Sequence, residues 1–252
     1  MTKVVLHGAC GHMGRVVCNL AAEDDSIEIV AGIDVVEDKA LGFPVYTKAS
    51  DCDVFADVVV DFSTAKAIDG LIDFCGQRKL PLVLCTTGLS DEQLSKVKEL
   101  SKEVAVLRSA NMSLGVNVLL DLVKRAAEIF SPAGFDMEVV ERHHNQKLDA
   151  PSGTALAIAD AMKEGAGKEF DYVYERSTRR EKRDFGEIGK SAVRAGNIVG
   201  MHEAIFAGTD EIITLNHQAT SKAVFAKGAL EAAKFISGRK PGMYDMQDVI
   251  KG

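Results

Sequence analysis

Short apolar runs alternate with helical patterns along the first half of the chain. Runs of four to seven residues, typical of buried strands, occur at residues 3–6, 27–33, 57–62, 82–85 and 104–107. Helical patterns follow up to residue 22, at residues 65–78 and at residues 91–102, and a long amphipathic helix is predicted over residues 114–130. This alternation predicts a Rossmann-like α/β domain with a doubly wound parallel sheet, whose ligands bind at the carboxyl ends of the strands.

The pattern changes in the second half of the chain. After a helix predicted from residue 153 to about residue 163, short strands are expected at residues 172–174, 192–199, 202–206 and 211–216, with no helix between them. A final helix is predicted over residues 221–238. We therefore expect a second, α+β domain with a mixed or antiparallel sheet.

A glycine-rich turn joins the first predicted strand to the first predicted helix. Its GxxGxxG pattern is formed by Gly8, Ala9, Cys10, Gly11, His12, Met13 and Gly14. Glycines allow a tight turn and a close approach of the backbone to a pyrophosphate at the helix N-terminus. The second predicted strand ends in Asp34, 20 residues beyond Gly14. An acidic residue at that distance accepts hydrogen bonds from the adenine ribose, although a plain strand–turn–helix remains the alternative.

The residues around Asp34 also bear on the choice of nucleotide. A carboxylate repels the 2′-phosphate of NADPH, and Val35 follows where an arginine would be expected to bind that phosphate. The sequence therefore predicts that NADH is preferred over NADPH as the cofactor.

A cluster of chemically active side chains lies between residues 143 and 154. His143 and His144 follow an alternating apolar run, and Lys147 lies in a polar stretch beyond them. The sequence PSGT at residues 151–154 is typical of a helix N-terminus, which attracts carboxylates. A proton carrier, a cation and an anion-binding helix end together indicate chemistry on a carboxylated substrate.

Other interpretations of this cluster remain open. A single histidine is more often structural than catalytic, and a serine or threonine at a helix start is commonly only a cap. Paired histidines also raise the possibility of zinc, but no HxxxH or CxxC spacing lies nearby and Lys147 would repel a cation. We therefore expect no metal.

Composition narrows the function classes further. The chain has 252 residues, 46% of them hydrophobic and 27% charged, as in an ordinary globular protein. Its net charge of −7 argues against a nucleic-acid partner, and no apolar run is long enough to span a membrane. The five cysteines are odd in number and form no CxxC. Together with an N-terminus that lacks a signal-peptide pattern, they indicate a cytoplasmic location.

The run HHNQKLDAPSGTA closely resembles the signature HHxxKxDAPSGTA of bacterial 4-hydroxy-tetrahydrodipicolinate reductase, or dihydrodipicolinate reductase, of lysine and diaminopimelate biosynthesis. The resemblance implies reduction of that dicarboxylate by NADH or NADPH. It also implies that His143 is the acid/base and Lys147 the proton donor, both catalytic. The substrate carboxylates would be bound by His144, Lys147, Gly153 and Thr154.

Further stretches resemble the same family. The family's usual GTTG and A-x-N-aromatic-S motifs touch the nicotinamide side of the cofactor, and here they read CTTG and SANMS. The resemblance thus adds six cofactor-binding residues: Cys85, Thr86, Thr87, Ser109, Ala110 and Asn111. Cys85 replaces a glycine and Met112 an aromatic residue. GEIG at residues 186–189 and RAGNIVGMH at residues 194–202 also match, the latter against RGGxxxGxH.

The resemblance also implies a domain plan. A discontinuous dinucleotide-binding domain would comprise residues 1–112 and 221–252, and residues 113–220 would bind substrate and build a homotetramer through their sheet. Two alternatives remain at this point. Another two-domain nicotinamide-dependent dehydrogenase would share the glycine motif without the histidine signature, and a non-catalytic NAD(P)-binding regulator would not need both His143 and Lys147.

Overall fold

The computed structural model describes all of residues 1–252, which form two compact units. Unit 1 comprises Met1–Leu114 and Ala223–Gly252, and unit 2 comprises Gly115–Lys222. Each unit has its own sheet and its own apolar core. None of the helices is both long and apolar enough to cross a membrane.

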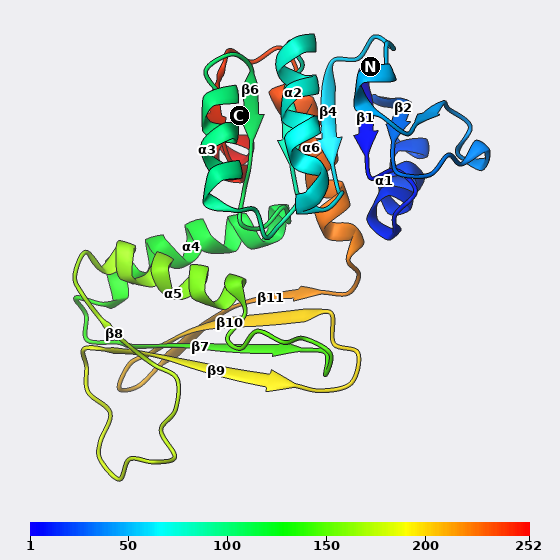
Figure 1. Cartoon of the computed structure of the whole chain (residues 1–252). Helices are drawn as coiled ribbons and strands as arrows, with labels where there is room; N and C mark the ends of the chain where they lie inside the picture. Colours follow the sequence, from blue (N-terminus) through cyan, green and yellow to red (C-terminus); the bar gives the residue numbers. More distant parts are fainter. The chain divides into compact units, whose positions relative to one another are not determined.

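Unit 1 is built on a parallel sheet of seven strands in the order β12-β6-β5-β4-β1-β2-β3 (Figure 1). The strands are β1 (Thr2–His7), β2 (Ile27–Ile33), β3 (Val45–Tyr46), β4 (Val58–Asp61), β5 (Leu82–Leu84), β6 (Ala105–Leu107) and β12 (Gly242–Tyr244). The helices are α1 (His12–Ala22), α2 (Ile68–Arg78), α3 (Asp91–Leu100), α6 (Ala223–Ile236) and α7 (Met246–Lys251), with three short 3₁₀ turns, Lys39–Leu41, Ala49–Asp51 and Ala65–Ala67.

Alternate residues of the central strands face opposite cores. Val4 and Leu6 pack with α1 and α6, whereas Val5 packs with α2 and α3 on the other face. Val58 and Val60 of β4 lie in the first core and Val59 in the second. A strand buried on both faces must be apolar throughout, which explains the uninterrupted runs in the sequence. The prediction of a doubly wound parallel sheet is confirmed.

Unit 2 is built on a mixed sheet of five strands in the order β11-β10-β7-β9-β8. These strands are β7 (Asp136–His143), β8 (Asp171–Val173), β9 (Glu187–Arg194), β10 (Gly200–Ala207) and β11 (Ile212–Ala219). Two helices, α4 (Leu114–Phe130) and α5 (Gly153–Ala166), cover one face of this sheet (Figure 1). The prediction of an α+β unit with a mixed sheet is confirmed.

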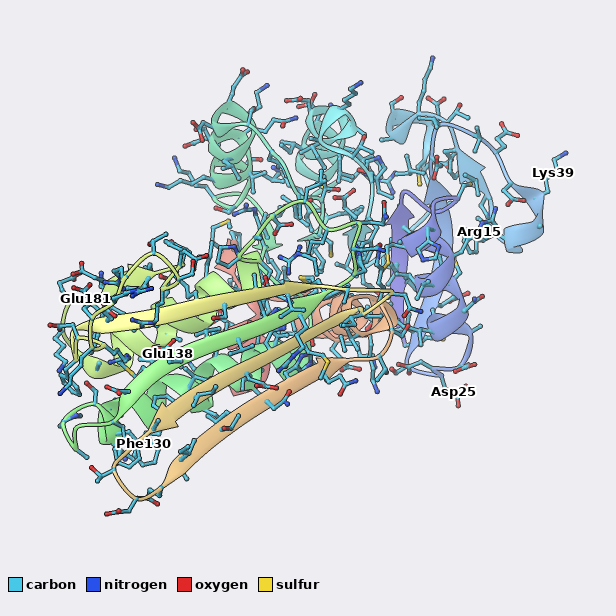
Figure 2. The ribbon with its side chains drawn as sticks, turned by 90° about the horizontal axis from the view of Figure 1, so that it is seen from below. Arg15, Asp25, Lys39, Phe130, Glu138 and Glu181 are labelled. Atoms are coloured by element: carbon cyan, nitrogen blue, oxygen red, sulfur yellow. The ribbon has the colours of Figure 1, made fainter.

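Burial alternates along β7, so Met137, Val139, Glu141 and His143 face the helices. Glu138 lies on the opposite face, which no helix of unit 2 covers (Figure 2). There Arg176 and Arg183 of the charge-dense loop both donate to Glu138, at 2.9 Å each. These ion pairs connect the loop at residues 176–184 to the sheet.

Some elements differ from their predicted positions. The strand predicted at residues 192–199 is β9, which begins earlier, at Glu187, and ends at Arg194, because a turn with Gly196 at a φ of +49° follows it. The strands β3 and β12 and the helix α7 were not predicted from the sequence. The two strands are two and three residues long, too short for a periodic signal, and they are paired by distant segments.

Replacing Gly228 of α6 by alanine should destabilise unit 1. A Cβ at this position would lie 1.7 Å from the Met112 carbonyl oxygen. We expect Gly228→Ala to lower the free energy of unfolding by more than about 2 kcal/mol through overpacking. The matched control is Gly70→Ala in α2, where nothing lies within 4 Å of the added Cβ. The control should stabilise the protein by about 0.5–1 kcal/mol. Equal melting temperatures for the two variants would contradict this packing argument.

Candidate functional site

The glycine turn of unit 1 is shaped by close backbone contacts. Gly8 has a φ of +82°, and a Cβ there would lie 2.6 Å from the Phe62 carbonyl oxygen. A Cβ on Gly14 would lie 2.2 Å from the Gly8 carbonyl oxygen. Gly11 is the N-cap of α1 and supplies no side-chain cap. The helix therefore begins with uncapped N–H groups beside a backbone that only glycine can form, and this arrangement suits a pyrophosphate.

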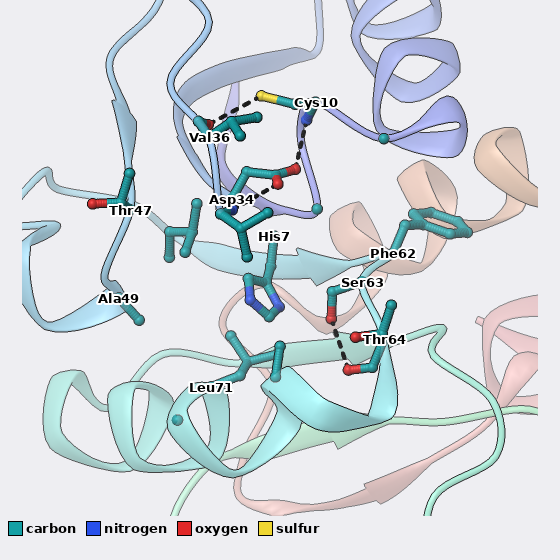
Figure 3. Close-up of a pocket in the computed structure, with 16 residues that line it drawn as sticks. His7, Cys10, Asp34, Val36, Thr47, Ala49, Phe62, Ser63, Thr64 and Leu71 are labelled. Atoms are coloured by element: carbon teal, nitrogen blue, oxygen red, sulfur yellow. Dashed lines mark hydrogen bonds between the residues drawn. The ribbon is translucent and has the colours of Figure 1, made fainter.

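A cavity of about 460 Å³ adjoins this turn (Figure 3). Four of the predicted cofactor-binding residues line it: Gly8, Cys10, Gly11 and Asp34. The Asp34 carboxylate accepts hydrogen bonds from the N–H groups of Cys10 and Val35, at 2.8 Å and 2.7 Å. The other predicted residues of the turn do not line the cavity. Ala9 is buried in the core, and His12 and Met13 are the first two residues of α1.

A histidine–carboxylate pair lies beside this cavity. Asp61 ends β4 with no exposed surface, and it lies 2.8 Å from the Nδ1 atom of His7, which ends β1. The Asp61 carboxylate also accepts hydrogen bonds from the Ser63 hydroxyl and the Thr86 N–H. Burial by itself would raise the pKa of Asp61, but these hydrogen bonds outweigh burial, and the pKa lies below its ordinary value.

The remaining predicted cofactor residues follow β5 and β6, outside that cavity. Thr86 is buried, and Cys85 is packed against the core, which raises the pKa of its thiol. After β6, the Asn111 side chain accepts a hydrogen bond from the Ser113 N–H at 2.9 Å. All six of these residues lie at the carboxyl ends of the adjacent parallel strands β5 and β6, and they also include Thr87, Ser109 and Ala110.

In unit 2 the centre of the predicted cluster is a buried carboxylate. Glu141 has no exposed surface, and its Oε2 lies 2.5 Å from the Nδ1 atom of His143. Arg194 of β9 donates to both Glu141 oxygens at 2.8 Å. Burial by itself would raise the pKa of Glu141, but the bonds from Arg194 and His143 outweigh it and lower the pKa. Glu141 is therefore ionised near neutral pH and holds the His143 ring by Nδ1.

The same carboxylate connects His143 to the start of α5. The Ser152 N–H donates to Glu141 at 3.0 Å, and the Ser152 hydroxyl caps the helix by accepting from the Ala155 N–H. The Ser152 hydroxyl also lies 3.1 Å from the Nε2 atom of His202. Burial, with a smaller contribution from nearby His143, lowers the pKa of His202 to about 4. His202 is therefore neutral, and its Nδ1 atom is buried without a partner.

Lys147 and His144 lie beside this network. The Lys147 ammonium pairs with the Asp149 carboxylate at 2.8 Å, and the backbone N–H of Lys147 donates to the His144 carbonyl. The hydrogen-bonded ion pair with Lys147 lowers the pKa of the Asp149 carboxyl. Gly153 and Thr154 form the first turn of α5, and nothing lies within 4 Å of the position of a Cβ on Gly153. A histidine, a lysine and the N-terminus of a helix thus occur within one segment of unit 2.

The structure therefore places the predicted residues in two groups, one in each unit. It also adds residues that were not predicted as catalytic, cofactor-binding or substrate-binding, namely His7, Asp61, Glu141, Ser152, Arg194 and His202. One signal was present: Glu141 precedes His143 by two residues directly after the alternating apolar run, and residues two apart on a strand face the same side. No group of three or more His, Cys, Asp or Glu side chains is arranged to hold a metal ion.

Two family models together match nearly the whole chain. Residues 2–112 match the N-terminal part of dihydrodipicolinate reductase, and residues 115–250 match its C-terminal part. The chain belongs to the dihydrodipicolinate reductase family. The resemblance carried by the HHNQKLDAPSGTA segment is thereby confirmed.

Individual family members resemble the chain over its full length. A protein of Caldanaerobacter subterraneus subsp. tengcongensis, named 4-hydroxy-tetrahydrodipicolinate reductase, is 52% identical over 100% of this chain and 99% of its own. One of Clostridium novyi with the same name is 46% identical over the same shares. The solved structure of dihydrodipicolinate reductase from Paenisporosarcina sp. TG-14 has a TM-score of 0.80 at 24% identity, covering 98% of this chain and 99% of that one, and it shares the fold.

The low pKa of His202 predicts a pH-dependent stability. A histidine with a depressed pKa in the folded state contributes stability that is present above its unfolded pKa of about 6.5 and is lost as pH falls towards about 4. We expect His202→Gln to be less stable than wild type at pH 7.5, because the contact with Ser152 is altered. Between pH 6.5 and pH 4, the free energy of unfolding should fall by up to about 3 kcal/mol less in the variant than in wild type. Urea unfolding that shows the same loss of stability in wild type and variant across that pH range would contradict this prediction.

Proposed function

We propose that this chain reduces 4-hydroxy-tetrahydrodipicolinate to tetrahydrodipicolinate in lysine and diaminopimelate biosynthesis. A hydride from NADH or NADPH and one proton are added to the substrate, water leaves, and the oxidised nucleotide is released. The observation that carries this proposal is the buried Glu141–His143–Arg194 network next to Lys147 and the α5 N-terminus. A different dehydrogenase or a non-catalytic regulator has no support of this kind, because both halves of the chain match this reductase family.

Unit 1 is suited to hold the nucleotide. Bound NADH or NADPH supplies the hydride. The pyrophosphate would lie on the N–H groups at Gly11 and the start of α1, where the close contacts of Gly8 and Gly14 exclude a Cβ. The Asp34 carboxylate would accept from the adenine ribose in place of its present backbone donors. Two further groups of residues would bind the nicotinamide side of the cofactor. One group follows β5 and comprises Cys85, Thr86 and Thr87. The other follows β6 and comprises Ser109, Ala110 and Asn111.

Unit 2 is suited to hold a dicarboxylate. Lys147 supplies a cation and His144 a hydrogen-bonding ring. Gly153 and Thr154 supply a helix N-terminus with open space above Gly153. Support comes from the related Paenisporosarcina reductase, which was solved with dipicolinate, a dicarboxylate, bound.

The network around Glu141 supports the proton-transfer roles that we propose for His143 and Lys147. Because ionised Glu141 accepts from Nδ1 of His143, the second ring nitrogen, Nε2, is the atom that exchanges a proton as acid or base. Glu141 also stabilises the imidazolium when His143 is protonated, and Arg194 holds the carboxylate in place. Lys147 donates a proton to the substrate. Its present partner, Asp149, is half exposed, so the substrate can replace it.

Removal of either catalytic side chain should abolish most turnover. We expect His143→Ala and Lys147→Ala each to lower kcat about 100-fold or more, the usual contribution of a positioned proton carrier. The dissociation constant for NADH should stay within about twofold, because nucleotide binding is assigned to unit 1. The assay generates substrate from pyruvate and aspartate semialdehyde and follows the loss of reduced-nucleotide absorbance. Lys168→Ala is the control, since Lys168 lies outside the cluster. Near-normal turnover in both variants would refute the assignment.

We further propose that NADH is preferred. Asp34 lines the cavity, and exposed Val35 provides no cation for a 2′-phosphate. We expect kcat/KM to be about tenfold higher with NADH, an electrostatic penalty of about 1.4 kcal/mol against NADPH. Asp34→Ser should reduce this ratio mainly by improving the use of NADPH. Comparable kcat/KM values for both nucleotides in the wild-type protein would contradict the preference.

The assembly and the location are also proposals. The sheet face of unit 2 that carries Glu138 has no helical cover, and it is the surface through which a homotetramer would form. Residues 113–220 would thus serve both substrate binding and assembly, and residues 1–112 and 221–252 would bind the nucleotide. All five cysteines are free thiols, which supports a reducing cytoplasm.

A further inference from the structure

The side chain of His7 is unusual for its position. It ends β1, whose preceding residues Val4, Val5 and Leu6 have no exposed surface. In the sheet it is paired with Ile33 of β2 and Asp61 of β4. Its ring is only 6% exposed, yet it lines the cavity beside the glycine turn, between Asp34 and Leu71 in the view of Figure 3. A buried polar ring here requires partners on two sides.

The Nδ1 side of the His7 ring has a hydrogen-bond partner, the Asp61 carboxylate. Asp61 is ionised, because hydrogen bonds lower the pKa of its carboxyl, so it can only accept. Because this carboxylate can only accept, Nδ1 of His7 carries a proton and donates a hydrogen bond to Asp61 over 2.8 Å. In the ring form that holds a single proton, the Nε2 atom carries a lone pair and is an acceptor. It has no hydrogen-bond partner in the protein.

The cavity offers a suitable environment for adenosine. Ile33, Val36, Ala49 and Leu71 supply apolar lining for a purine, and Asp34 supplies an acceptor. Adenosine carries hydrogen-bond donors, which are its 6-amino group and its ribose hydroxyls. A 2′-phosphate offers only acceptors at the same position. A cavity with two acceptors, Asp34 and the His7 Nε2 atom, therefore matches NADH better than NADPH.

We infer that His7 is a nucleotide-specificity residue whose Nε2 atom accepts a hydrogen bond from the adenosine half of the dinucleotide. Asp61 is its positioning residue, because it holds the proton on Nδ1. This inference rests on the proposed use of a pyridine nucleotide and explains part of the preference for NADH.

Two substitutions separate recognition from structure. In His7→Asn the amide nitrogen replaces Nδ1, so the donor to Asp61 is kept and the acceptor at Nε2 is lost. In His7→Gln the longer amide places an acceptor near the former Nε2 atom, and the donor to Asp61 is lost. Dissociation constants for NADH, NADPH and reduced nicotinamide mononucleotide are measured by fluorescence without substrate, and melting temperatures are measured on the same samples.

We expect His7→Asn to melt close to wild type and to bind NADH about three- to tenfold more weakly, the effect of one hydrogen bond. NADPH should weaken less. The mononucleotide, which lacks adenosine, should bind unchanged. His7→Gln should show the reverse pattern, with a lower melting temperature and nearly normal NADH affinity. Reduced nicotinamide hypoxanthine dinucleotide identifies the donor: equal affinity for wild type and His7→Asn would place it at the 6-amino group, which NADPH shares, and would contradict a role in choosing between the nucleotides. If it loses affinity in His7→Asn as NADH does, the donor is a ribose hydroxyl.

Unchanged NADH affinity in His7→Asn would overturn the inference, as would equal weakening of the mononucleotide. The proposed function fails separately. Wild-type protein that binds NADH in a His7-dependent manner without reducing the substrate would refute the reductase activity and leave His7 as a nucleotide contact. Normal turnover with no effect of His7 would refute only the inference. Absence of nucleotide binding by the wild-type protein would refute both.

Discussion

Glu141 carries a negative charge inside unit 2 with no exposed surface, and such a charge is tolerated only when donors surround it. Arg194 contributes two hydrogen bonds, and the His143 ring and the Ser152 N–H contribute one each. These donors come from β7, β9 and the start of α5. The carboxylate therefore holds the His143 ring and the start of α5 together.

Unit 1 uses the same construction at its own sheet edge. Asp61 is buried at the end of β4 and collects donors from β1, from its own loop and from the segment after β5. In each unit a buried carboxylate near a strand end thus forms a hydrogen bond with the Nδ1 atom of a histidine. A strand end is a precise place for such a pair, because the ladder hydrogen bonds hold the backbone while the next residues are free to contact the ligand.

The glycines have a different role from these charged pairs. Gly8 and Gly14 bring backbone segments closer than any side chain would permit, so the start of α1 lies beside the end of β4. That close approach gives the cavity its shape and leaves the helix N-terminus open. The glycine turn of unit 1 is thus built by backbone packing, whereas the Glu141 network of unit 2 is built by buried charge.

Much of this could be predicted from the sequence alone. The buried strands, the glycine turn, Asp34 and the segment with His143 and Lys147 are local features, because apolar runs, turn residues and helix starts are read within a few positions. The partners of the buried carboxylates could not be predicted in this way. His7 and Asp61 are 54 residues apart, and Arg194 and Glu141 are 53 apart. Strand order and register alone decide that these side chains meet, and the short strands β3 and β12 likewise form only by pairing with β2 and β6.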